Sequence, residues 1–122
     1  MEALEPKQPS ADERAVVATA LDYFEGWFDG DEVRMARALH PNLVKRRAGD
    51  ELGITTRERM LELTRQGEGR ADAADRRLDI EVTGLYGDIA SATVRSAVYH
   101  EYLHLVRTRD GWKIANALWQ PT

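Results

Sequence analysis

The sequence predicts one α+β domain in which helices cover one face of a curved antiparallel sheet. In the first half of the chain apolar residues recur at helical spacing, whereas from Leu78 onward they alternate with polar residues, as in half-buried strands. Helices first and strands after are typical of the α+β class. The chain of 122 residues has the length of a single domain and is long enough to bury an apolar core without disulfides.

The composition excludes several kinds of site and partner. With 17 Lys and Arg against 21 Asp and Glu, the net charge of −4 lacks the basic field typical of nucleic-acid binding. The chain has no cysteine, which excludes disulfides and cysteine-ligated metals and is consistent with a reducing cytoplasm. No apolar run approaches the roughly 18 residues of a membrane span. We therefore expect a cytoplasmic protein with no metal, no cofactor, and neither nucleic acid nor membrane as a partner.

The first helix has a clear start. Residues 1–10 contain acidic residues and prolines without the apolar stretch of a signal peptide, and we expect a flexible tail ahead of a single domain at residues 11–122. Ser10 and Glu13 have the spacing of a capping box. Apolar residues follow at helical spacing, which predicts a helix over residues 11–29 that a glycine ends.

Two shorter helices are predicted next. Asp31 can cap the first, and Pro41 ends it because proline disfavours helical geometry at the residue before it. Thr55 and Glu58 have the spacing of another capping box, which opens a helix to about residue 66. The polar segment 70–77 is predicted to be a mobile loop. The expected buried stripe of the second helix is Val33, Ala36 and Leu39.

Alternation and turn signals predict the strands. The run from residue 89 to 108 exceeds the usual strand length of ~3–10 residues, so we expect a bulge or turn near residues 96–99. Gly87-Asp88 and Asp110-Gly111 are turn signals that separate this run from its neighbours. The predicted strands therefore cover residues 43–47, 78–83, 89–108 and 112–120, with the long run divided in two.

Several segments together resemble a known family. They are Tyr23 and Trp27, the stretch 39–46 (LHPNLVKR), the stretch 102–106 (YLHLV), the stretch 110–114 (DGWKI), and Asn116 with Trp119. This pattern resembles the putative lumazine-binding family of the nuclear-transport-factor-2-like superfamily, from about residue 12 to residue 120. The resemblance implies a cone-shaped fold in which the curved sheet wraps three helices and leaves a pocket at its open end. It also implies a homodimer that forms through the outer face of the sheet.

The resemblance does not fix a reaction. The superfamily includes ketosteroid isomerase, polyketide cyclases, limonene-epoxide hydrolase and scytalone dehydratase, besides many members with no known reaction. Function has to be argued from the site, because one fold carries many chemistries.

Aromatic and basic side chains are candidates for binding a ligand. Tyr23 and Trp27 lie one helical turn apart and are predicted to line the pocket, with a plain core role as the alternative. Lys45 matches an inward position of the family pattern, and a solvated surface charge is its alternative. Asn116 and Trp119 differ by three positions, so they face opposite sides of a strand unless a bulge intervenes, and only one of them is needed in the pocket.

Glu101 is the main candidate for acid–base chemistry. If Leu103 and Leu105 point inward, alternation places Glu101 and Tyr99 on the same face, where Tyr99 would also contact a ligand. A carboxylate among apolar neighbours is suited to proton transfer. A one-residue slip would instead turn His100, Tyr102 and His104 inward, and His104 would then be the acid–base group.

His40 is the second catalytic candidate, because imidazole titrates near neutral pH. Its alternative role is to hydrogen-bond a free carbonyl at the end of a helix.

These residues support three hypotheses. The first is a small-molecule-binding protein with a mostly apolar pocket and no committed reaction. The second is a cofactor-free acid–base enzyme of the isomerase, cyclase or dehydratase type that uses Glu101 or His40. The third is a module that associates through the outer sheet face. A carboxylate inside the cone within hydrogen-bond reach of a second polar group favours the enzyme, whereas a cone filled by side chains favours the module.

Overall fold

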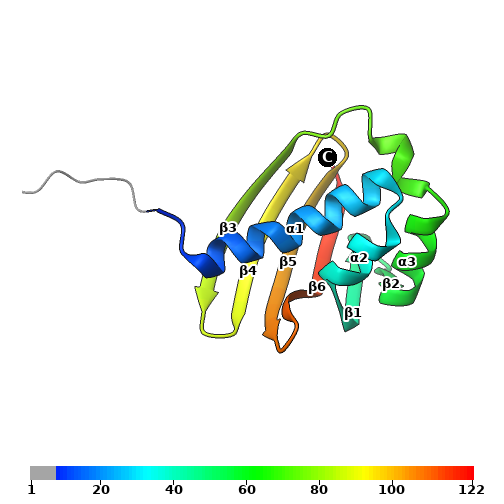
Figure 1. The fold of residues 1–122 in the computed structure, drawn as a ribbon. Coiled ribbons are helices and arrows are strands. Elements are labelled where there is room, and N and C mark those ends of the chain that lie inside the picture. Colours follow the sequence, from blue (N-terminus) through cyan, green and yellow to red (C-terminus); the bar gives the residue numbers. More distant parts are fainter. Residues whose placement is uncertain (1–7) are drawn as a thin grey trace, which may run out of the picture.

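A six-stranded sheet with helices on one face forms the protein (Figure 1). The computed structural model describes residues 8–122, so most of the predicted tail, residues 1–7, lies outside the described residues. The helices are α1 (Ala11–Asp29), α2 (Glu32–Ala38), α3 (Arg57–Arg65) and the 3₁₀ helix η1 (Glu68–Asp72). The strands are β1 (Leu39–Arg47), β2 (Gly53–Thr56), β3 (Leu78–Tyr86), β4 (Ile89–Ser96), β5 (Tyr99–Thr108) and β6 (Gly111–Pro121).

The predicted α+β class, with helices that cover one face of a sheet, is confirmed. α1 lies across the sheet, while α2 and α3 lie beside β1 and β2 (Figure 1). The strand order is β2-β1-β6-β5-β4-β3, and every neighbouring pair is antiparallel except β1 and β6. The prediction of a wholly antiparallel sheet is therefore wrong for one pair. No hairpin joins β1 to β6, so no turn fixes their relative direction.

α1 has the predicted bounds and cap. The Ser10 hydroxyl oxygen accepts a hydrogen bond from the Glu13 backbone N–H at 3.1 Å. Gly30 ends the helix with a φ of 68°, a left-handed conformation that glycine adopts without steric cost. The side of α1 that faces the sheet supplies a large part of the core, with Val16, Ala20, Tyr23, Phe24 and Phe28 buried.

The two short helices form as predicted, but the buried stripe of α2 and the N-terminal cap of α3 are shifted by about one residue from the predicted positions. α2 ends at Ala38 and buries Met35 and Ala38, whereas Val33 is 70% exposed. The predicted buried stripe is wrong at Val33. Leu39 belongs to β1 and not to α2, so the start of β1 sets which side of this short helix faces the core. The cap of α3 is Thr56 and not Thr55, because β2 remains paired with β1 through Thr56.

The break predicted in the long β-rich run is confirmed. β4 ends at Ser96 and β5 begins at Tyr99. The Ser96 hydroxyl oxygen accepts hydrogen bonds from the backbone N–H groups of Val98 at 3.3 Å and Tyr99 at 2.9 Å, which closes the turn. A serine side chain thus supplies turn chemistry where neither glycine nor proline is present.

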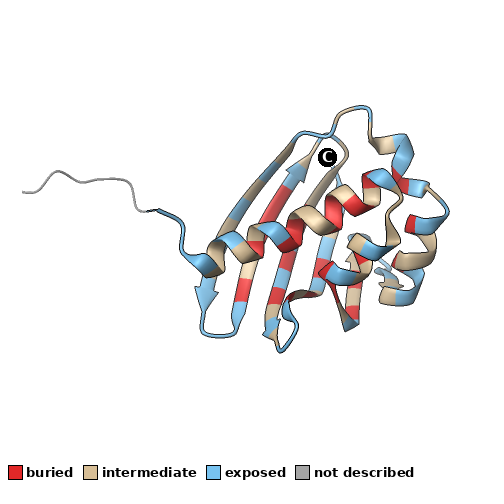
Figure 2. Ribbon diagram, viewed as in Figure 1, coloured by how far each residue is buried: buried red, intermediate tan, exposed pale blue. Residues whose placement is uncertain are grey.

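The core lies between α1 and the inner face of the sheet. Figure 2 shows buried segments along α1 and on the strands behind it. Alternating residues of three strands face this layer, and those buried there include Ala90, Ala92, Val94, Leu103, Leu105, Trp112, Ile114 and Ala117. The inner face is therefore apolar over most of its area, which sets the surroundings of any polar group on it.

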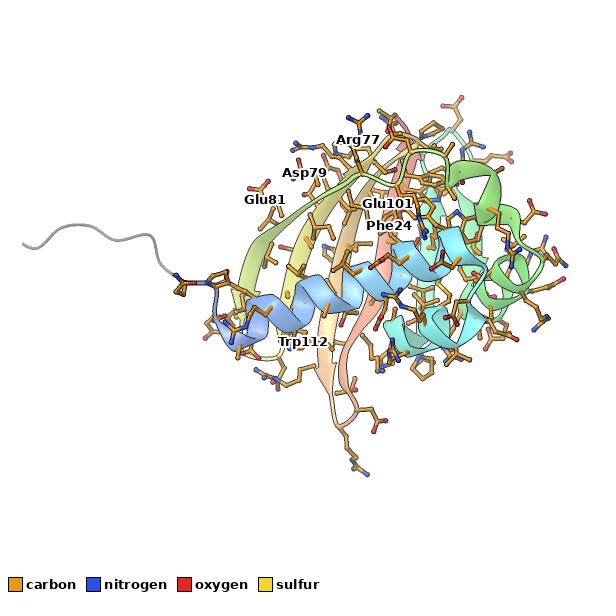
Figure 3. The ribbon with its side chains drawn as sticks, turned by 45° about the horizontal axis from the view of Figure 1, so that its top comes forward. Phe24, Arg77, Asp79, Glu81, Glu101 and Trp112 are labelled. Carbon is orange, nitrogen blue, oxygen red and sulfur yellow. The ribbon has the colours of Figure 1, made fainter. Side chains whose placement is uncertain are left out.

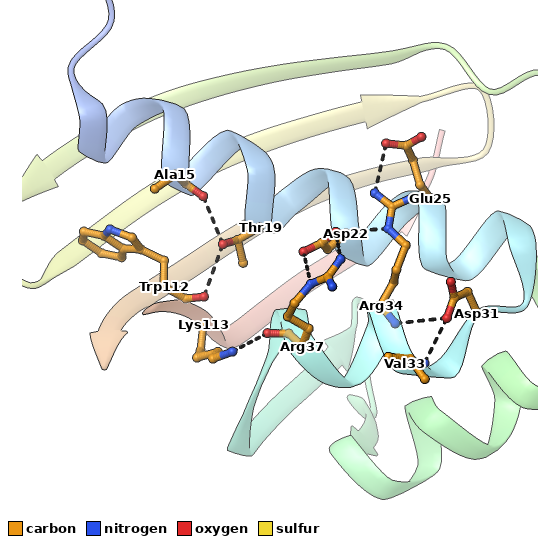
Figure 4. Close-up of polar contacts among 10 residues, drawn as sticks. All are labelled: Ala15, Thr19, Asp22, Glu25, Asp31, Val33, Arg34, Arg37, Trp112 and Lys113. Carbon is orange, nitrogen blue, oxygen red and sulfur yellow. Dashed lines mark hydrogen bonds and ion pairs between the residues drawn. The ribbon is translucent and has the colours of Figure 1, made fainter. Parts of the chain in front are cut away.

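Polar contacts fix the helices relative to one another and to the sheet (Figure 4). Asp22 on α1 accepts hydrogen bonds from Arg34 at 3.0 Å and from Arg37 at 2.8 and 2.9 Å. The hydrogen bonds from Arg37, followed by those from Arg34, lower the pKa of the Asp22 carboxyl below its ordinary value, although partial burial opposes them. Less than one turn before Asp22 on α1, the Thr19 hydroxyl donates to the Trp112 carbonyl of β6 at 3.2 Å. These contacts hold α1 in a fixed position over β6.

Of the helices at residues 8–122, none is long and apolar enough to cross a membrane.

Candidate functional site

Three polar side chains from three different elements meet on the inner face of the sheet. Tyr23 comes from α1, Lys45 from β1 and Glu101 from β5. The Lys45 ammonium donates to the Tyr23 hydroxyl oxygen at 2.5 Å, and the Tyr23 hydroxyl donates to Glu101 Oε1 at 2.9 Å. Lys45 Nζ lies 3.7 Å from the same carboxylate oxygen. We call these three residues the polar trio.

Strand alternation and the parallel β1–β6 pair bring the polar trio together. Glu101 lies opposite Val94 of β4 and Trp119 of β6 and shares the inner face with Leu103. Figure 3 shows Glu101 in the region between α1 and the sheet. Lys45 of β1 pairs with Ala117 of β6, and β6 lies between β1 and β5. The Lys45 side chain therefore reaches Glu101 across β6. The β1–β6 pairing joins residues more than seventy positions apart, which no local pattern reports.

The trio is enclosed and its hydrogen bonding is complete. Glu101 is 1% exposed, Tyr23 3% and Lys45 9%. Every buried side-chain nitrogen and oxygen atom of residues 8–122 has a hydrogen-bond partner. A lone buried charge would cost several kcal/mol, roughly 3–5 when one partner of a buried pair is removed, so each charge depends on the other. Lys45 Nζ also lies 5.1 Å from the ring centre of Tyr23 and 5.2 Å from that of Trp119.

Burial changes the acidity of two members of the trio. It raises the pKa of the Tyr23 hydroxyl well above its ordinary value of 10, and the nearby negative Glu101 adds to the effect. Burial lowers the pKa of the Lys45 ammonium, although the Glu101 carboxylate opposes this change. Tyr23 therefore remains a neutral hydrogen-bond donor over a wide pH range, and Lys45 loses its proton more readily than an exposed lysine does.

Half-buried aromatic rings lie next to the trio, at the end of the sheet where β5 begins and β6 ends. The rings of Tyr99 and Trp119 meet edge to face, with 5.2 Å between their centres. Asp72 of η1 accepts hydrogen bonds from Trp27 Nε1 at 3.2 Å and from the Tyr99 hydroxyl. Burial and this bond to Asp72 raise the pKa of the Tyr99 hydroxyl. We call Trp27, Tyr99 and Trp119 the aromatic rim.

Asp72 is a site residue that the sequence did not indicate. It lies in the segment 70–77 that was expected to be a mobile loop, and no local pattern pairs it with Trp27 or Tyr99. The one local signal is Gly69, at which a Cβ atom would lie 2.2 Å from the Trp27 carbonyl oxygen. Only glycine allows η1 to approach α1 this closely, and the approach places Asp72 beside the rim.

Six of the predicted site residues come together here, namely Tyr23, Trp27, Lys45, Tyr99, Glu101 and Trp119. The inward register of β5 is confirmed, because Glu101, Leu103 and Leu105 are buried while Tyr102 and His104 are exposed. The slipped register with His104 inside is therefore wrong. The parts these six residues play in binding or catalysis stay predictions.

Two predicted site residues lie elsewhere. His40 is half-buried at the start of β1, where its Nδ1 accepts from the Asn42 backbone N–H at 3.0 Å. The chain bulges out of the β1–β6 ladder between Leu39 and Val44, which carries His40 away from the trio. Asn116 is exposed on the outer face opposite His104. Its inward placement is wrong because a bulge at Ala115 shifts the register of β6, so that Ala117 and Trp119 face inward instead.

A hollow of about 500 Å³ lies between α1 and β3, where Val17 and Ile80 border it, and two more hollows lie on the outer face of the sheet. One of about 510 Å³ is bordered by Tyr86 and Ile89, and another of about 650 Å³ by Tyr102 and Leu118. His104 and Asn116 border both. Around the trio, by contrast, the chain's own side chains fill the space, and an apolar pocket inside the cone stays a prediction. Within the described part of the chain, no three histidine or carboxylate side chains gather in a way that could hold a metal ion.

A comparison with protein families identifies the chain's relatives. Residues 11–120 match the model of the family described as putative lumazine-binding. The chain belongs to this family. A comparison with curated proteins found no match.

Solved structures place this lumazine-binding family member among nuclear-transport-factor-2-like folds. It is similar to such a protein of unknown function from Shewanella baltica, with a TM-score of 0.74 and 12% identity over 96% of this chain and 98% of that one. It is also similar to a ketosteroid isomerase-like protein from Erwinia carotovora atroseptica, with a TM-score of 0.63 and 14% identity over 92% of this chain and 97% of that one. For a putative dehydratase from Streptomyces avermitilis the TM-score is 0.63 and the identity is 17%, over 94% of this chain and 99% of that one. At these identities the likeness shows the fold alone.

The Tyr23 hydroxyl predicts a measurable effect on stability. In Tyr23→Phe, Lys45 and Glu101 each lose a hydrogen-bond partner in a buried place, so the free energy of unfolding should fall by about 1–3 kcal/mol at pH 7. The raised pKa of Tyr23 favours the folded state fully below about pH 10, and this contribution is lost as the pH rises toward the folded-state value. The wild-type advantage over Tyr23→Phe should therefore shrink above about pH 10. Urea unfolding at a series of pH values measures both effects.

The control is Tyr102→Phe, which removes an exposed hydroxyl on the outer face and should change the free energy of unfolding by less than about 0.5 kcal/mol. Equal stability of the Tyr23→Phe and wild-type chains at pH 7 would show that the buried chain of hydrogen bonds contributes nothing.

Proposed function

We propose that this lumazine-binding family member binds a small, flat organic molecule at the polar trio, which the molecule reaches through the aromatic rim. The observation that carries the proposal is an enclosed set of two donors and one acceptor, Lys45, Tyr23 and Glu101, beside half-buried rings. Polar groups that converge in apolar surroundings are typical of small-molecule sites. The family description, putative lumazine-binding, supports the same class of ligand.

Each part of the site has a distinct task in this proposal. Lys45 Nζ lies 5.2 Å and Arg47 Cζ 5.3 Å from the centre of the Trp119 ring, which Tyr99 meets edge to face. In this proposal Tyr99 moves aside and the flat Trp119 ring stacks on the ligand. Lys45 and Tyr23 donate to carbonyl oxygens of the ligand, and Glu101 accepts from an N–H or O–H. Because the trio is enclosed, the rim has to open for a ligand to enter. The absence of cysteine supports the predicted cytoplasmic location.

A second candidate function is favoured by the hydrogen bond between Tyr23 and Glu101 at 2.9 Å. A buried carboxylate next to a neutral phenol has the parts of an acid–base catalyst: the carboxylate removes a proton beside a carbonyl group, and the phenol donates to the carbonyl oxygen. Two structural neighbours, a ketosteroid isomerase-like protein and a putative dehydratase, are named after reactions of this type. This enzyme would use Glu101 and not His40.

We also propose that two copies of the chain associate through the outer face of the sheet. Exposed apolar side chains cross this face from one edge strand to the other: Ile54, Leu118, Tyr102, Ile89 and Tyr86. All of them except Ile54 border hollows of about 510 and 650 Å³ that a partner surface can fill. An exposed apolar area of this extent is typical of an interaction surface. The family resemblance favours a second copy as the partner.

The binding proposal predicts that lumazine quenches tryptophan fluorescence in a saturable manner. Trp119→Leu keeps an apolar side chain but removes the flat ring, so it should weaken lumazine binding by about tenfold. Tyr86→Leu, on the exposed outer face, is the matched control and should leave the dissociation constant unchanged. Isothermal titration of the three chains, each checked for folding by circular dichroism, provides the measurement. Absence of saturable binding, or equal weakening by both substitutions, would contradict the proposal.

The acid–base candidate predicts exchange of carbon-bound protons. With cyclohexanone as a probe in D₂O, the wild-type chain should speed the exchange of protons beside the carbonyl, and NMR follows the loss of signal. Glu101→Gln should lower this rate by about 10²–10⁴-fold. His40→Gln, away from the trio, should retain it. A rate that is unchanged in Glu101→Gln would exclude this enzyme.

The association proposal predicts a dimer that dissociates on dilution. Light scattering of the wild-type chain should give twice the monomer mass at high concentration. Leu118→Glu places a charge in the centre of the outer face and should yield a monomer. Val33→Glu changes a residue that is 70% exposed on α2, away from this face, and should leave the dimer intact. A wild-type chain that stays monomeric at every concentration would refute the proposal.

A further inference from the structure

Lys45 differs from Lys113, the other lysine among the described residues. The sequence has three lysines, Lys7, Lys45 and Lys113. Lys113 is half-buried at the edge of the domain, where it donates to the Arg37 carbonyl oxygen at 2.6 Å. Lys45 is the lysine enclosed in the core, within 2.5 Å of a hydroxyl oxygen and 3.7 Å of a carboxylate. A hydrogen-bond donor for a ligand does not need such an arrangement, since an exposed lysine would serve.

We propose that Lys45 is a nucleophile that forms a reversible imine with an aldehyde or ketone group of the bound molecule. The inference rests on the proposed binding function, because the same site has to admit the molecule. It goes further by naming the reactive group of the ligand and the atom that attacks it, Lys45 Nζ.

The contacts of the trio form a path for the proton that Lys45 has to lose. Nζ donates to the Tyr23 oxygen at 2.5 Å, and that oxygen donates to Glu101 Oε1 at 2.9 Å. When Lys45 passes a proton to Tyr23 and Tyr23 passes its own to Glu101, the result is a neutral amine, a neutral phenol and a neutral carboxylic acid. No proton has to enter from solvent, and no net charge is created in the core.

The surroundings make this neutral arrangement accessible from the ion pair. A buried ion pair carries a desolvation cost for both of its charges, which the neutral form avoids. Burial also lowers the pKa of the Lys45 ammonium, as in lysines that act as nucleophiles after desolvation. The rings of Tyr23 and Trp119 keep water from Nζ, which limits hydrolysis of an imine once it has formed.

The reaction balances with the groups present. The lone pair of the neutral Lys45 amine attacks the carbonyl carbon, and the carbonyl oxygen takes up a proton from nitrogen to give a carbinolamine. The C–O bond then breaks as Glu101 donates its proton to the leaving hydroxyl, which departs as water. The products are a protonated imine on Lys45, a Glu101 carboxylate and one water molecule, so the ion pair is restored at the end.

Lys45 is also the member of the trio nearest to solvent. Its side chain is 11% exposed, whereas that of Glu101 is 1% exposed. Trp119 covers Nζ at 5.2 Å, so opening of the aromatic rim uncovers the amine before it uncovers the carboxylate. A ligand that enters through the rim therefore meets Nζ first, with Tyr23 and Glu101 behind it as the proton path.

The test traps the imine in the full chain. Wild-type protein is incubated with benzaldehyde and sodium cyanoborohydride at neutral pH, and peptide mapping by mass spectrometry locates the resulting benzyl groups. We expect the adduct on Lys45 to form at least ~10-fold faster than on Lys113 and to saturate with benzaldehyde. In urea this preference should vanish. Benzyl alcohol, which has the same ring but no carbonyl, should slow the labelling of Lys45 alone.

A variant tests the proton path. Glu101→Gln cannot take up or return the proton, so labelling of Lys45 should fall by at least ~10-fold while that of Lys113 stays unchanged. Should this variant fail to fold, the wild-type comparison between Lys45 and Lys113 still decides the matter. Labelling of Lys45 that is no faster than that of Lys113 would overturn the proposal. Saturable lumazine binding without Lys45 labelling would overturn the imine and leave the binding function standing, whereas failure of both would remove the two together.

Discussion

The rest of the site depends on one buried arrangement, in which two side chains of opposite charge both hydrogen-bond to the same tyrosine hydroxyl. Lys45 and Glu101 come from strands that are distant in the sequence, and neither is tolerated in an apolar core without the other. The Tyr23 hydroxyl fits between them because it both accepts and donates a hydrogen bond. α1, β1 and β5 must therefore keep a fixed mutual position, and the packing of α1 on the sheet provides it.

The parallel pairing of β1 with β6 makes this arrangement possible. It places Lys45 two strands away from Glu101 with β6 between them, while the bulge at Ala115 turns Trp119 inward over the amine. The hydrogen bonds of Asp72 to Trp27 and Tyr99 then fix the rings at the end of the sheet. The polar trio and the aromatic rim thus form a layered site, with charges in the core and flat apolar surface nearer to solvent. This order suits a ligand with a polar edge and an aromatic body.

The two faces of the sheet have separate properties. The inner face is closed by α1 and holds its polar groups in complete hydrogen bonding. Among residues 8–122, no helix covers the outer face, which exposes apolar side chains around its hollows. Because strand side chains alternate between faces, one stretch of β5 serves both, with Glu101 inside and Tyr102 outside. A substitution on one face can therefore leave the side chains of the other face in place.

The sequence by itself determined the local structure and part of the site. The cap at Ser10, the glycine at the end of α1 and the alternation around Glu101 act between near neighbours, so their signals are readable in the chain. The sequence left two registers of β5 open, and the structure decided between them by burying the leucines two and four positions after Glu101, which a slip would have exposed to water.

Tertiary structure decided which residues meet. The direction of β1 beside β6, the bulges that displaced His40 and Asn116, and the partnership of Asp72 with Tyr99 and Trp27 all depend on contacts between distant segments. Such contacts leave no periodic pattern in either segment. They depend on how the whole core packs and not on the residues next to them in the chain.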